Sequence, residues 1–262
     1  MSKTTTVVKH ADGTTISCTT TQSGSGAAPK LKVYYTMTGA PNPQIVDLAA
    51  AELGIDLASV RKEVDLPGME NRQPEMLEKN PAGGLPFVEL ASGECIAETM
   101  ALCELFETME NNGKTLLGTT PAEQANTRMW QRRVEQQICI PLMSAFRWGK
   151  AKDFFAKRGH HGLTPSDEAA EQQMTVVKDQ LKWLNDLMGS NDYICGNAYT
   201  LADVTLYGQL WFFSVTPGFG PPFPELLELD LPWIWAWYKR VEARQATQAC
   251  DAGYAERGPL KK

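Results

Sequence analysis

The chain has 262 residues, of which 43% are hydrophobic and 21% charged, and its formal net charge is −6. This composition excludes collagen-like, coiled-coil and wholly disordered classes, and the length predicts two domains of unequal size. The acidic balance makes nucleic acid and anionic membranes poor candidate partners, because both bind clustered Lys and Arg.

The six cysteines stand far apart, at positions 18, 95, 103, 139, 195 and 250, without the short spacing of a metal site. The chain has only three histidines, two of them adjacent. We therefore expect no metal cofactor. The N-terminus lacks the apolar run of a secretory signal, and no stretch of about 18 apolar residues occurs. We expect a cytoplasmic protein with reduced thiols.

Residues 1–29 are rich in Thr, Ser and Gly. Two β-prone runs, Val7–His10 and Thr14–Thr20, flank Asp12-Gly13, a dipeptide typical of tight hairpin turns. Ser23–Ala28 has the composition of a flexible linker. We therefore predict an N-terminal extension that forms a β-hairpin, with a disordered tail as the alternative.

Residues 30–110 alternate between strand and helix patterns. β-branched, aromatic and alternating runs predict strands at 31–35, 60–64, 85–90 and 95–97. Apolar residues at helical spacing predict helices from Pro43 to Gly54 and from Thr99 to about Met109. This order predicts a small α/β domain in which helices cover the faces of a mixed sheet.

From about residue 120 onward every pattern is helical. We predict helices that begin near residues 120, 164, 200 and 231, the first two with a threonine N-cap followed by proline. Thr200 and Asp203 form a variant capping box, which explains both residues by folding alone. The predicted organisation is an extension at 1–29, an α/β domain at 30–110, an all-helical domain at 120–250 and a tail at 251–262.

Four segments give the chain a resemblance to the cytosolic glutathione transferase superfamily. They are the strand, loop and helix from Lys32 to Gly54, the Asn-Pro-Ala-Gly-Gly-Leu-Pro sequence at 80–86, the pair Glu98-Thr99 and the helix-capping segment 193–203. The resemblance covers about residues 30–250 and is nearest to nu-like bacterial and fungal types. It implies a thioredoxin-like N-terminal domain, an all-α C-terminal domain, glutathione as co-substrate and usually a homodimer.

The resemblance also implies glutathione-binding roles for four residues. Leu85 would precede a cis-proline, Pro86, and its backbone would pair with the cysteinyl part of glutathione like an added strand. Thr99, at a helix N-terminus, would hold the γ-glutamyl carboxylate, and Glu98 would pair with the ammonium group. A plain edge strand and a plain N-cap are the structural alternatives.

A transferase must stabilise the glutathione thiolate, because a free thiol with a pKa of about 8.5 is mostly protonated at neutral pH. Residues 30–58 contain neither Cys nor Ser, which argues against the cysteine and serine types of the superfamily. Asn42 is one candidate donor, because its loop is similar to the Thr-Pro-Asn-Gly of nu-like members. This chain has Ala40 where the nu-like members have a companion threonine, and Thr38 would take over the role of that threonine. Tyr35 is the tyrosine-type alternative, with core packing as its other interpretation.

Gly84 departs from the family pattern. Many members carry a basic or amide residue at this position, and that residue reaches the glycyl carboxylate of glutathione. Arg72, Lys79 or a residue of the helical domain would then make the contact, or the bound thiol differs from plain glutathione.

The electrophile pocket is expected between the domains, lined by Trp130, Arg133 and Phe146 of the first long helix. An ordinary core stripe with a solvated basic pair, Arg132-Arg133, is the alternative. The predicted function is a glutathione transferase acting on a small hydrophobic electrophile or disulfide, with disulfide-bond reductase or peroxidase activity as further options. The alternative is a non-catalytic transferase-like binding or interaction module.

Overall fold

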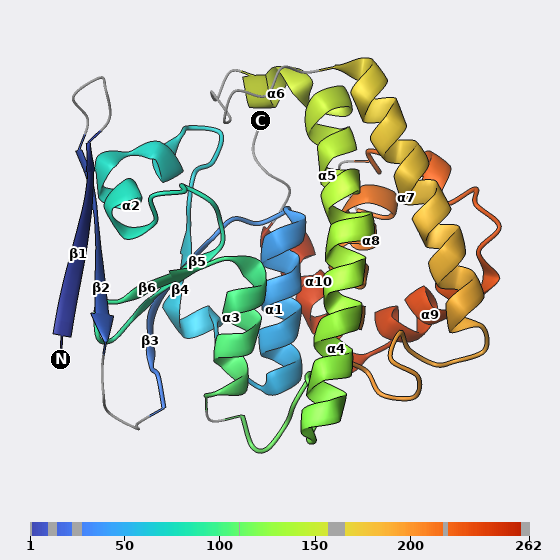
Figure 1. The fold of residues 1–262 in the computed structure, drawn as a ribbon, viewed down its shortest axis with the longest axis horizontal. Helices are drawn as coiled ribbons and strands as arrows, with labels where there is room; N and C mark the ends of the chain where they lie inside the picture. The colour runs from blue at the N-terminus through green and yellow to red at the C-terminus, as the bar shows by residue number, and fades with distance from the viewer. Residues whose placement is uncertain are drawn as a thin grey trace. The chain divides into compact units, whose positions relative to one another are not determined.

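The computed structural model describes residues 2–9, 15–22, 28–109, 111–156, 166–216 and 220–257. The chain divides into two compact units, one running up to Lys114 and one beginning at Thr115 (Figure 1). Every described strand belongs to the first unit, whereas the described elements of the second unit are all helical. The predicted fold class, an α/β domain followed by an all-helical domain, is confirmed.

The N-terminal extension forms the predicted hairpin. Strands β1 (Ser2–Lys9) and β2 (Thr15–Gln22) pair antiparallel, with Ser2 opposite Gln22 and Lys9 opposite Thr15. The expected Asp12-Gly13 turn and most of the expected linker, Ser23–Ala28, lie outside the described residues.

A four-stranded mixed sheet is the centre of the first unit. Its order is β4-β3-β5-β6, and the strands are β3 (Leu31–Thr36), β4 (Arg61–Glu63), β5 (Phe87–Leu90) and β6 (Cys95–Ala97). β3 runs parallel to β4 and antiparallel to β5, and β5 runs antiparallel to β6. Helix α1 (Pro41–Leu53) makes the crossover that a parallel pair requires. Gly54 ends this helix at φ 79°, a conformation that glycine adopts readily.

Helices cover both faces of this sheet. α1 packs against α3 (Thr99–Glu107), and the two helices lie side by side in Figure 1. The short helix α2 (Pro74–Lys79) places Met76 against Tyr35, Val64 and Phe87. Short 3-10 turns at Ala58–Val60 and Glu70–Arg72 complete the unit.

The helical unit begins with one long helical run interrupted by π-helical turns. α4 (Pro121–Val134) starts with the predicted capping box between Thr120 and Glu123. A π-helical turn at Glu135–Cys139 leads into α5 (Ile140–Ala145), and a second at Phe146–Lys150 precedes α6 (Lys152–Ala156). Pro141 is the second residue of α5, two positions after the first π-turn, and the altered hydrogen-bond pattern of that turn tolerates the N–H that proline lacks.

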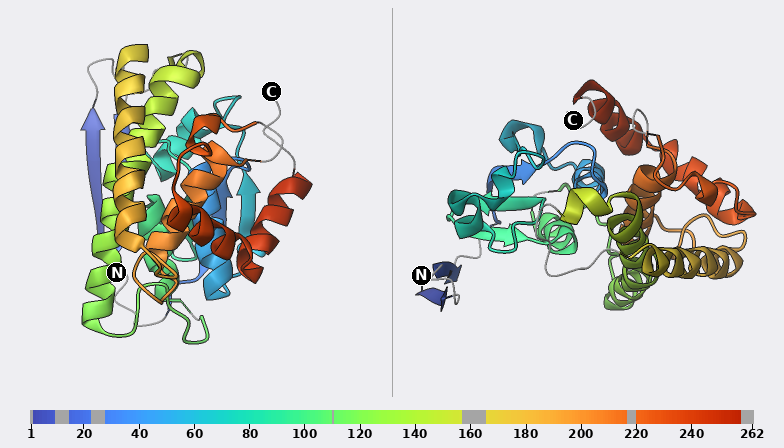
Figure 2. Two further views of the ribbon diagram at one scale, coloured as in Figure 1. Left: turned by 90° about the vertical axis from the view of Figure 1, so that its right-hand side faces the viewer. Right: turned by 90° about the horizontal axis from the view of Figure 1, so that it is seen from above.

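The remaining helices are α7 (Asp167–Met188), α8 (Leu201–Ser214), α9 (Pro232–Glu242) and α10 (Gln245–Arg257), with a 3-10 turn at Pro224–Leu226. α7 packs along α5, and α8, which is buried over almost its whole length, packs against α4 (Figure 2). The residues Thr164-Pro165, where a helix start was expected, lie outside the described part, and Ser166 caps α7. None of the described helices is long and apolar enough to cross a membrane.

Candidate functional site

The four predicted glutathione-binding residues lie at one end of the four-stranded sheet. Tyr35 is opposite Phe87, and Phe87 is opposite Ala97. Pro86 and Glu98 therefore extend from neighbouring strands at the same end. β3 also ends there and leads through a short loop into α1. The strand register thus brings this set of residues together although they come from separate segments.

Leu85 lies just outside the strand ladder. The pairings of β5 with β3 and with β6 both stop at Phe87, so the peptide groups of Leu85 extend beyond them. The Leu85-Pro86 peptide is cis, as the resemblance implies. The Leu85 side chain packs against the cluster around Tyr35 and Phe87. Side-chain packing therefore fixes Leu85 while its backbone stays beyond the ladder.

Three side chains hold the loop before Leu85. The donated hydrogen bonds are Asn71 Nδ2 to Gly83 O at 2.7 Å, Arg72 Nη1 to Ala82 O at 3.1 Å and Asn80 Nδ2 to Gly84 O at 2.8 Å. Gly83 has a φ of 60°, and a Cβ on it would lie 2.7 Å from an Arg72 nitrogen, so glycine is required there. A Cβ on Gly84, in contrast, would meet no atom within 4 Å. The roles of Asn71 and Asn80 were missed, because the sequence around them signals only turns.

Glu98 and Thr99 stand where β6 passes into α3. Glu98 is exposed and has φ 77° and ψ 126°, a conformation that costs a non-glycine residue about 1–3 kcal/mol. Its side chain makes no capping hydrogen bond to α3. The N-terminus of this helix carries partial positive charge and suits an anionic group. Thr99, its first residue, adds a hydroxyl at that point.

Asn42 is the second residue of α1. It is partly exposed and lies between Pro41 and Pro43 at the N-terminus of the helix. The helix begins at the sheet end where β3 stops, so the Asn42 amide comes from the same end as Leu85. A helix N-terminus lowers the pKa of a thiol placed near it.

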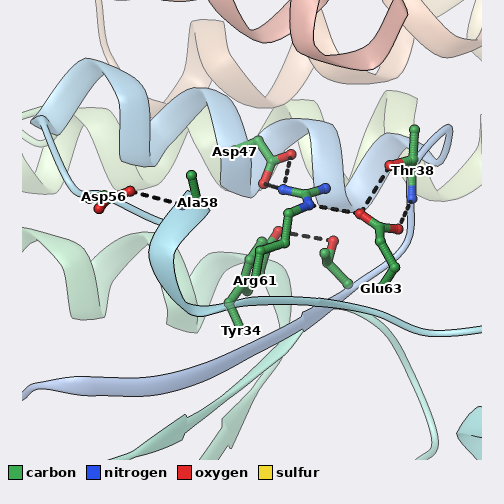
Figure 3. Close-up of polar contacts among 8 residues, drawn as sticks. Tyr34, Thr38, Asp47, Asp56, Ala58, Arg61 and Glu63 are labelled. Atoms are coloured by element: carbon green, nitrogen blue, oxygen red, sulfur yellow. Dashed lines mark hydrogen bonds and ion pairs between the residues drawn. The ribbon is translucent and has the colours of Figure 1, made fainter. Parts of the chain in front are cut away.

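Thr38 lies in the loop between β3 and α1 and is bound to Glu63. Its backbone N–H and its hydroxyl donate to the Glu63 carboxylate at 2.9 and 3.0 Å (Figure 3). The hydroxyl hydrogen is therefore directed at a carboxylate and is not offered to a thiolate in this arrangement. Burial opposes ionisation of Glu63, but its hydrogen bond and charge contact with Arg61 lower its pKa. Thr38 thus fixes the loop that leads to Asn42.

Arg61 completes this network. Its Nη1 bonds both Asp47 carboxylate oxygens, at 3.1 and 2.9 Å, and its Nε bonds Glu63 at 2.7 Å (Figure 3). Burial alone would lower the pKa of Arg61, but the neighbouring Asp47 charge leads to a net rise. The ion pairs tie β4 to α1 and to the β3–α1 loop.

Tyr35 belongs to a buried polar cluster on the face covered by α2. Its ring stacks on Phe87 with centroids 4.4 Å apart, and its hydroxyl donates to Glu89 at 3.2 Å. Glu89 pairs with Val33, two residues before Tyr35. The hydroxyl is therefore directed away from the strand end where Leu85 lies, which favours the core-packing interpretation of Tyr35.

Glu89 also forms ion pairs with Lys32, at 2.5 Å, and with Lys79. Hydrogen bonds from these two lysines lower the pKa of Glu89 to about 2. Lys79, considered for the glycyl carboxylate, is thus bound to Glu89, and Arg72 is bound to the loop before Leu85.

The predicted pocket residues of the helical unit fall into two groups. The Arg133 guanidinium lies 4.8 Å from the Trp130 ring centroid. Phe146 instead packs edge-on against the rings of Phe155, Phe212 and Phe213. It follows Trp130 by 16 residues, which corresponds to about 24 Å along the helical run. One small electrophile therefore does not reach both groups.

In the part of the chain that the structure describes, no group of three or more His, Cys, Asp or Glu side chains is placed to hold a metal ion.

Two family descriptions match this chain. Residues 31–105 match "Glutathione S-transferase, N-terminal domain" and residues 167–240 match "Glutathione S-transferase, C-terminal domain". Both domains of the fold are thus those of a glutathione transferase. The chain belongs to the cytosolic glutathione S-transferase superfamily.

Relatives with known names differ in how much of their length matches. Glutathione S-transferase 2 of Saccharomyces cerevisiae is 28% identical over 235 residues, covering 86% of this chain and 91% of the relative. Elongation factor 1-gamma of Rattus norvegicus is 30% identical over 162 residues, which is 60% of this chain but only 33% of that protein. A solved glutathione S-transferase domain-containing protein from Marinobacter aquaeolei is 28% identical, with a TM-score of 0.68 over 82% of this chain and 98% of that chain.

Proposed function

We propose that this protein binds glutathione at the sheet end formed by Leu85, Glu98 and Thr99 and presents its thiolate to an electrophile. The observation that carries the proposal is the strand register. It leaves the Leu85 peptide beyond the ladder and sets it beside the N-terminus of α3. A peptide-like thiol with an anionic end matches both features.

Each site residue has a defined part in this proposal. The Leu85 backbone pairs with the cysteinyl part of glutathione, and Pro86 holds that backbone in place. Thr99 and the N-terminus of α3 bind the γ-glutamyl carboxylate. The Glu98 carboxylate pairs with the ammonium group of the γ-glutamyl residue.

Asn42 is proposed as the donor to the sulfur. Its side-chain amide can donate a hydrogen bond to a thiolate, and the N-terminus of α1 adds a favourable partial charge. Thr38 and Tyr35, the other two candidates, both donate their hydroxyl hydrogens to carboxylates. We choose Asn42 because it stands at the N-terminus of α1, at the sheet end where Leu85 lies.

Disulfide reduction is the second reaction we propose. The glutathione thiolate attacks one sulfur of a small disulfide, forms a mixed disulfide with glutathione and releases the other sulfur as a thiolate. A second glutathione thiolate then attacks the mixed disulfide, giving oxidised glutathione and the remaining thiol. In this scheme both electrons come from glutathione, and no cysteine stands in the segment 30–58 that leads to Asn42.

The test measures binding, turnover and thiol pKa. We expect retention on immobilised glutathione and turnover of 1-chloro-2,4-dinitrobenzene or of hydroxyethyl disulfide with glutathione. Replacing Asn42→Ala should raise the pKa of bound glutathione and lower kcat/KM by about 10- to 100-fold, corresponding to loss of one charge-assisted hydrogen bond.

Tyr35→Phe is the paired variant. It removes only the hydroxyl that faces Glu89, so the pKa of the bound thiol should stay unchanged. A raised pKa in Tyr35→Phe with none in Asn42→Ala would reverse the assignment. Absence of both retention and turnover in the unmodified protein would contradict the enzyme proposal.

A binding or interaction module without catalysis is the second candidate. The observation that favours it is the match to elongation factor 1-gamma, at 30% identity over 162 residues. In that case the protein turns over neither substrate, whether or not it is retained on immobilised glutathione. We further propose a homodimer in the cytoplasm, which suits the superfamily and the absence of a disulfide among the five described cysteines.

A further inference from the structure

Asn42, the proposed donor to the sulfur, stands between two anchored points of the chain. Thr38, four residues earlier, donates its backbone N–H and its hydroxyl to the Glu63 carboxylate at 2.9 and 3.0 Å (Figure 3). Asp47, five residues later, accepts hydrogen bonds from Arg61 Nη1 at both carboxylate oxygens, at 3.1 and 2.9 Å. Both partners belong to the short strand β4, so one strand holds the chain on either side of Asn42.

The two anchored points are joined through a single guanidinium. Arg61 Nε donates to Glu63 at 2.7 Å, while Nη1 of the same group holds Asp47. The Arg61 side chain is only 13% exposed, and its guanidinium carbon lies 5.5 Å from the centroid of the buried Tyr34 ring. A guanidinium is planar and its donors have fixed directions, so packing against this ring fixes both carboxylates relative to β4.

The chain around Asn42 has little conformational freedom of its own. Only four residues connect β3 to α1. Gly39 turns this connection at φ 87°, and Pro41 and Pro43 restrict φ on either side of Asn42. A displacement of Thr38 is therefore transmitted to the start of α1 and is not absorbed by a flexible loop.

Stability gives little reason for a charged group at this anchor. The Glu63 side chain is 47% exposed, and ion pairs at such exposure contribute little to the free energy of unfolding. Charged hydrogen bonds do supply direction, because a carboxylate with two acceptor oxygens fixes two donors at once. Direction matters most beside a catalytic group, where a small displacement lowers the rate strongly.

We propose that Glu63 is a positioning residue for the reaction with glutathione: through Thr38 it holds the start of α1 so that the Asn42 amide stays directed at the sulfur. The inference rests on the proposed function and deepens it, since it makes the acidity of the bound thiol depend on a carboxylate that does not touch the ligand. Thr38 is the link between Glu63 and Asn42, not a donor to the sulfur.

The test measures the pKa of bound glutathione, from the ultraviolet absorbance of the thiolate as a function of pH, together with kcat and KM. Glu63→Gln keeps the shape of the side chain but loses its charge and one of two acceptor oxygens. We expect the pKa of the bound thiol to rise and kcat/KM to fall about 10-fold, as for a displaced catalytic group.

The sign of the change separates positioning from direct electrostatics. Removal of a negative charge by itself favours a nearby thiolate and would lower the pKa of the thiol. Displacement of Asn42 removes a hydrogen bond to the thiolate and raises that pKa. A lowered or unchanged pKa of the bound thiol in Glu63→Gln would overturn the proposal.

A double variant shows whether Glu63 acts through Asn42. In the Asn42→Ala background, Glu63→Gln should change kcat/KM by less than about twofold, because the group that Glu63 positions is already absent. The pKa of the bound thiol should stay where Asn42→Ala alone puts it. Independent, additive effects of the two substitutions would overturn the link.

Thr38→Val tests the link from its other side. It removes the hydroxyl but keeps the backbone N–H that also donates to Glu63, so its effect on the thiol pKa should have the same sign as that of Glu63→Gln and be smaller. This variant replaces Glu63→Gln as the main test if the latter does not fold. A larger effect in Thr38→Val than in Glu63→Gln would show that the hydroxyl serves the sulfur directly.

Glu89→Gln is the matched control in the same unit. It removes a carboxylate that pairs with Lys32 and Lys79 and makes no described contact with the loop before α1. The pKa of the bound thiol should stay unchanged, and Tm is recorded for every variant. An equal rise of the thiol pKa in Glu89→Gln and Glu63→Gln would show that general loss of stability, and not position, raises it.

The results also separate this inference from the proposed function. If glutathione is bound and Asn42→Ala raises the pKa of its thiol while Glu63→Gln does not, the positioning role alone is wrong. If the unmodified protein neither binds glutathione nor turns over a substrate, the proposed function fails, and the positioning role fails with it.

Discussion

The two units of this protein enclose charged side chains in opposite ways. In the N-terminal unit, Arg61 is matched by Asp47 and Glu63. Glu89, which is nearly buried, is matched in the same unit by two lysines. In the helical unit, Asp203 is fully buried, and its donors among the described residues are all neutral: Ile194 N, Thr200 N, Thr200 Oγ1 and Trp237 Nε1. Arg147 faces an aromatic ring.

The difference shows in the acidity of the two carboxylates. Hydrogen bonds from lysines lower the pKa of Glu89 to about 2, whereas burial raises the pKa of Asp203 to about 6 against the effect of its four hydrogen bonds. Ion pairs and neutral donors are thus two solutions to the same desolvation problem. Among the described residues, Arg147 has neither an ion-pair partner nor a hydrogen-bond partner for its buried Nε.

The largest expected effect comes from breaking an ion pair in the N-terminal unit. Arg61→Met leaves Asp47 without its bidentate partner and should lower the free energy of unfolding by about 3–5 kcal/mol. All seven tryptophans lie in the helical unit. The loss should therefore be measured by urea unfolding followed by circular dichroism, with tryptophan fluorescence recorded in parallel.

Arg61→Met combined with Asp47→Asn is the control, because it removes the unpaired charge and should recover part of the loss. If the free energy of unfolding of Arg61→Met alone lies within about 1 kcal/mol of that of the unmodified protein, the ion pair contributes no more than a weak surface contact.

A smaller effect is expected from the neutral-donor site. Asp203→Asn keeps the shape of the side chain but replaces one carboxylate oxygen by an NH2 group, so two of the four donors lose their acceptor. It should cost about 2–3 kcal/mol at pH 7. Tryptophan fluorescence during urea unfolding measures this loss of stability directly, since Trp237 is one of the donors.

The pH dependence of Asp203 has a definite sign. Its folded pKa is raised above the ordinary value, so the native state holds the proton more tightly than the unfolded chain. Its contribution to stability is full below about pH 4 and is lost as the pH rises through about 6. Asp203→Asn should lack this decline, and an identical pH profile in the variant would contradict the assignment.

The smallest effect is expected at Glu89. Lys32→Met removes one of two cations, the side chain removed is 59% exposed, and Lys79 remains. The cost should stay below about 1 kcal/mol at neutral pH. Glu89 has a lowered pKa, so its contribution is lost as the pH falls from about 4.5 towards 2.

In Lys32→Met this acid-induced loss should begin at a higher pH, as followed by circular dichroism. An acid transition at the same pH as in the unmodified protein would show that Lys79 alone determines the acidity of Glu89.

Local chemistry made most of the fold predictable. Gly54 ends α1 and Thr120 with Glu123 starts α4, because caps act on residues next to them in the chain. The sheet-end site could be located for the same reason. Leu85-Pro86 and Glu98-Thr99 are adjacent pairs, and their meeting requires only that β5 and β6 form a hairpin.

The contacts that distinguish the candidate residues were not predictable, because they join distant segments. Thr38 meets Glu63 across 25 positions, and Tyr35 meets Glu89 across 54. Periodicity gives the face of a strand on which a side chain lies, but not the group that it meets there. The π-helical turn at Arg147 has no sequence signature either, since its residues fit an ordinary helix pattern.

Gly84 gives the site a degree of evolutionary freedom. A side chain at this position would meet no atom within 4 Å, and its backbone carbonyl is already held by Asn80. Its neighbour Gly83, in contrast, is fixed by its positive φ and by Arg72. A lineage carrying this chain can therefore add a basic or amide group beside the proposed thiol site by one amino-acid replacement without rebuilding the loop. Selection on thiol preference can therefore act on position 84, whereas selection on folding acts on position 83.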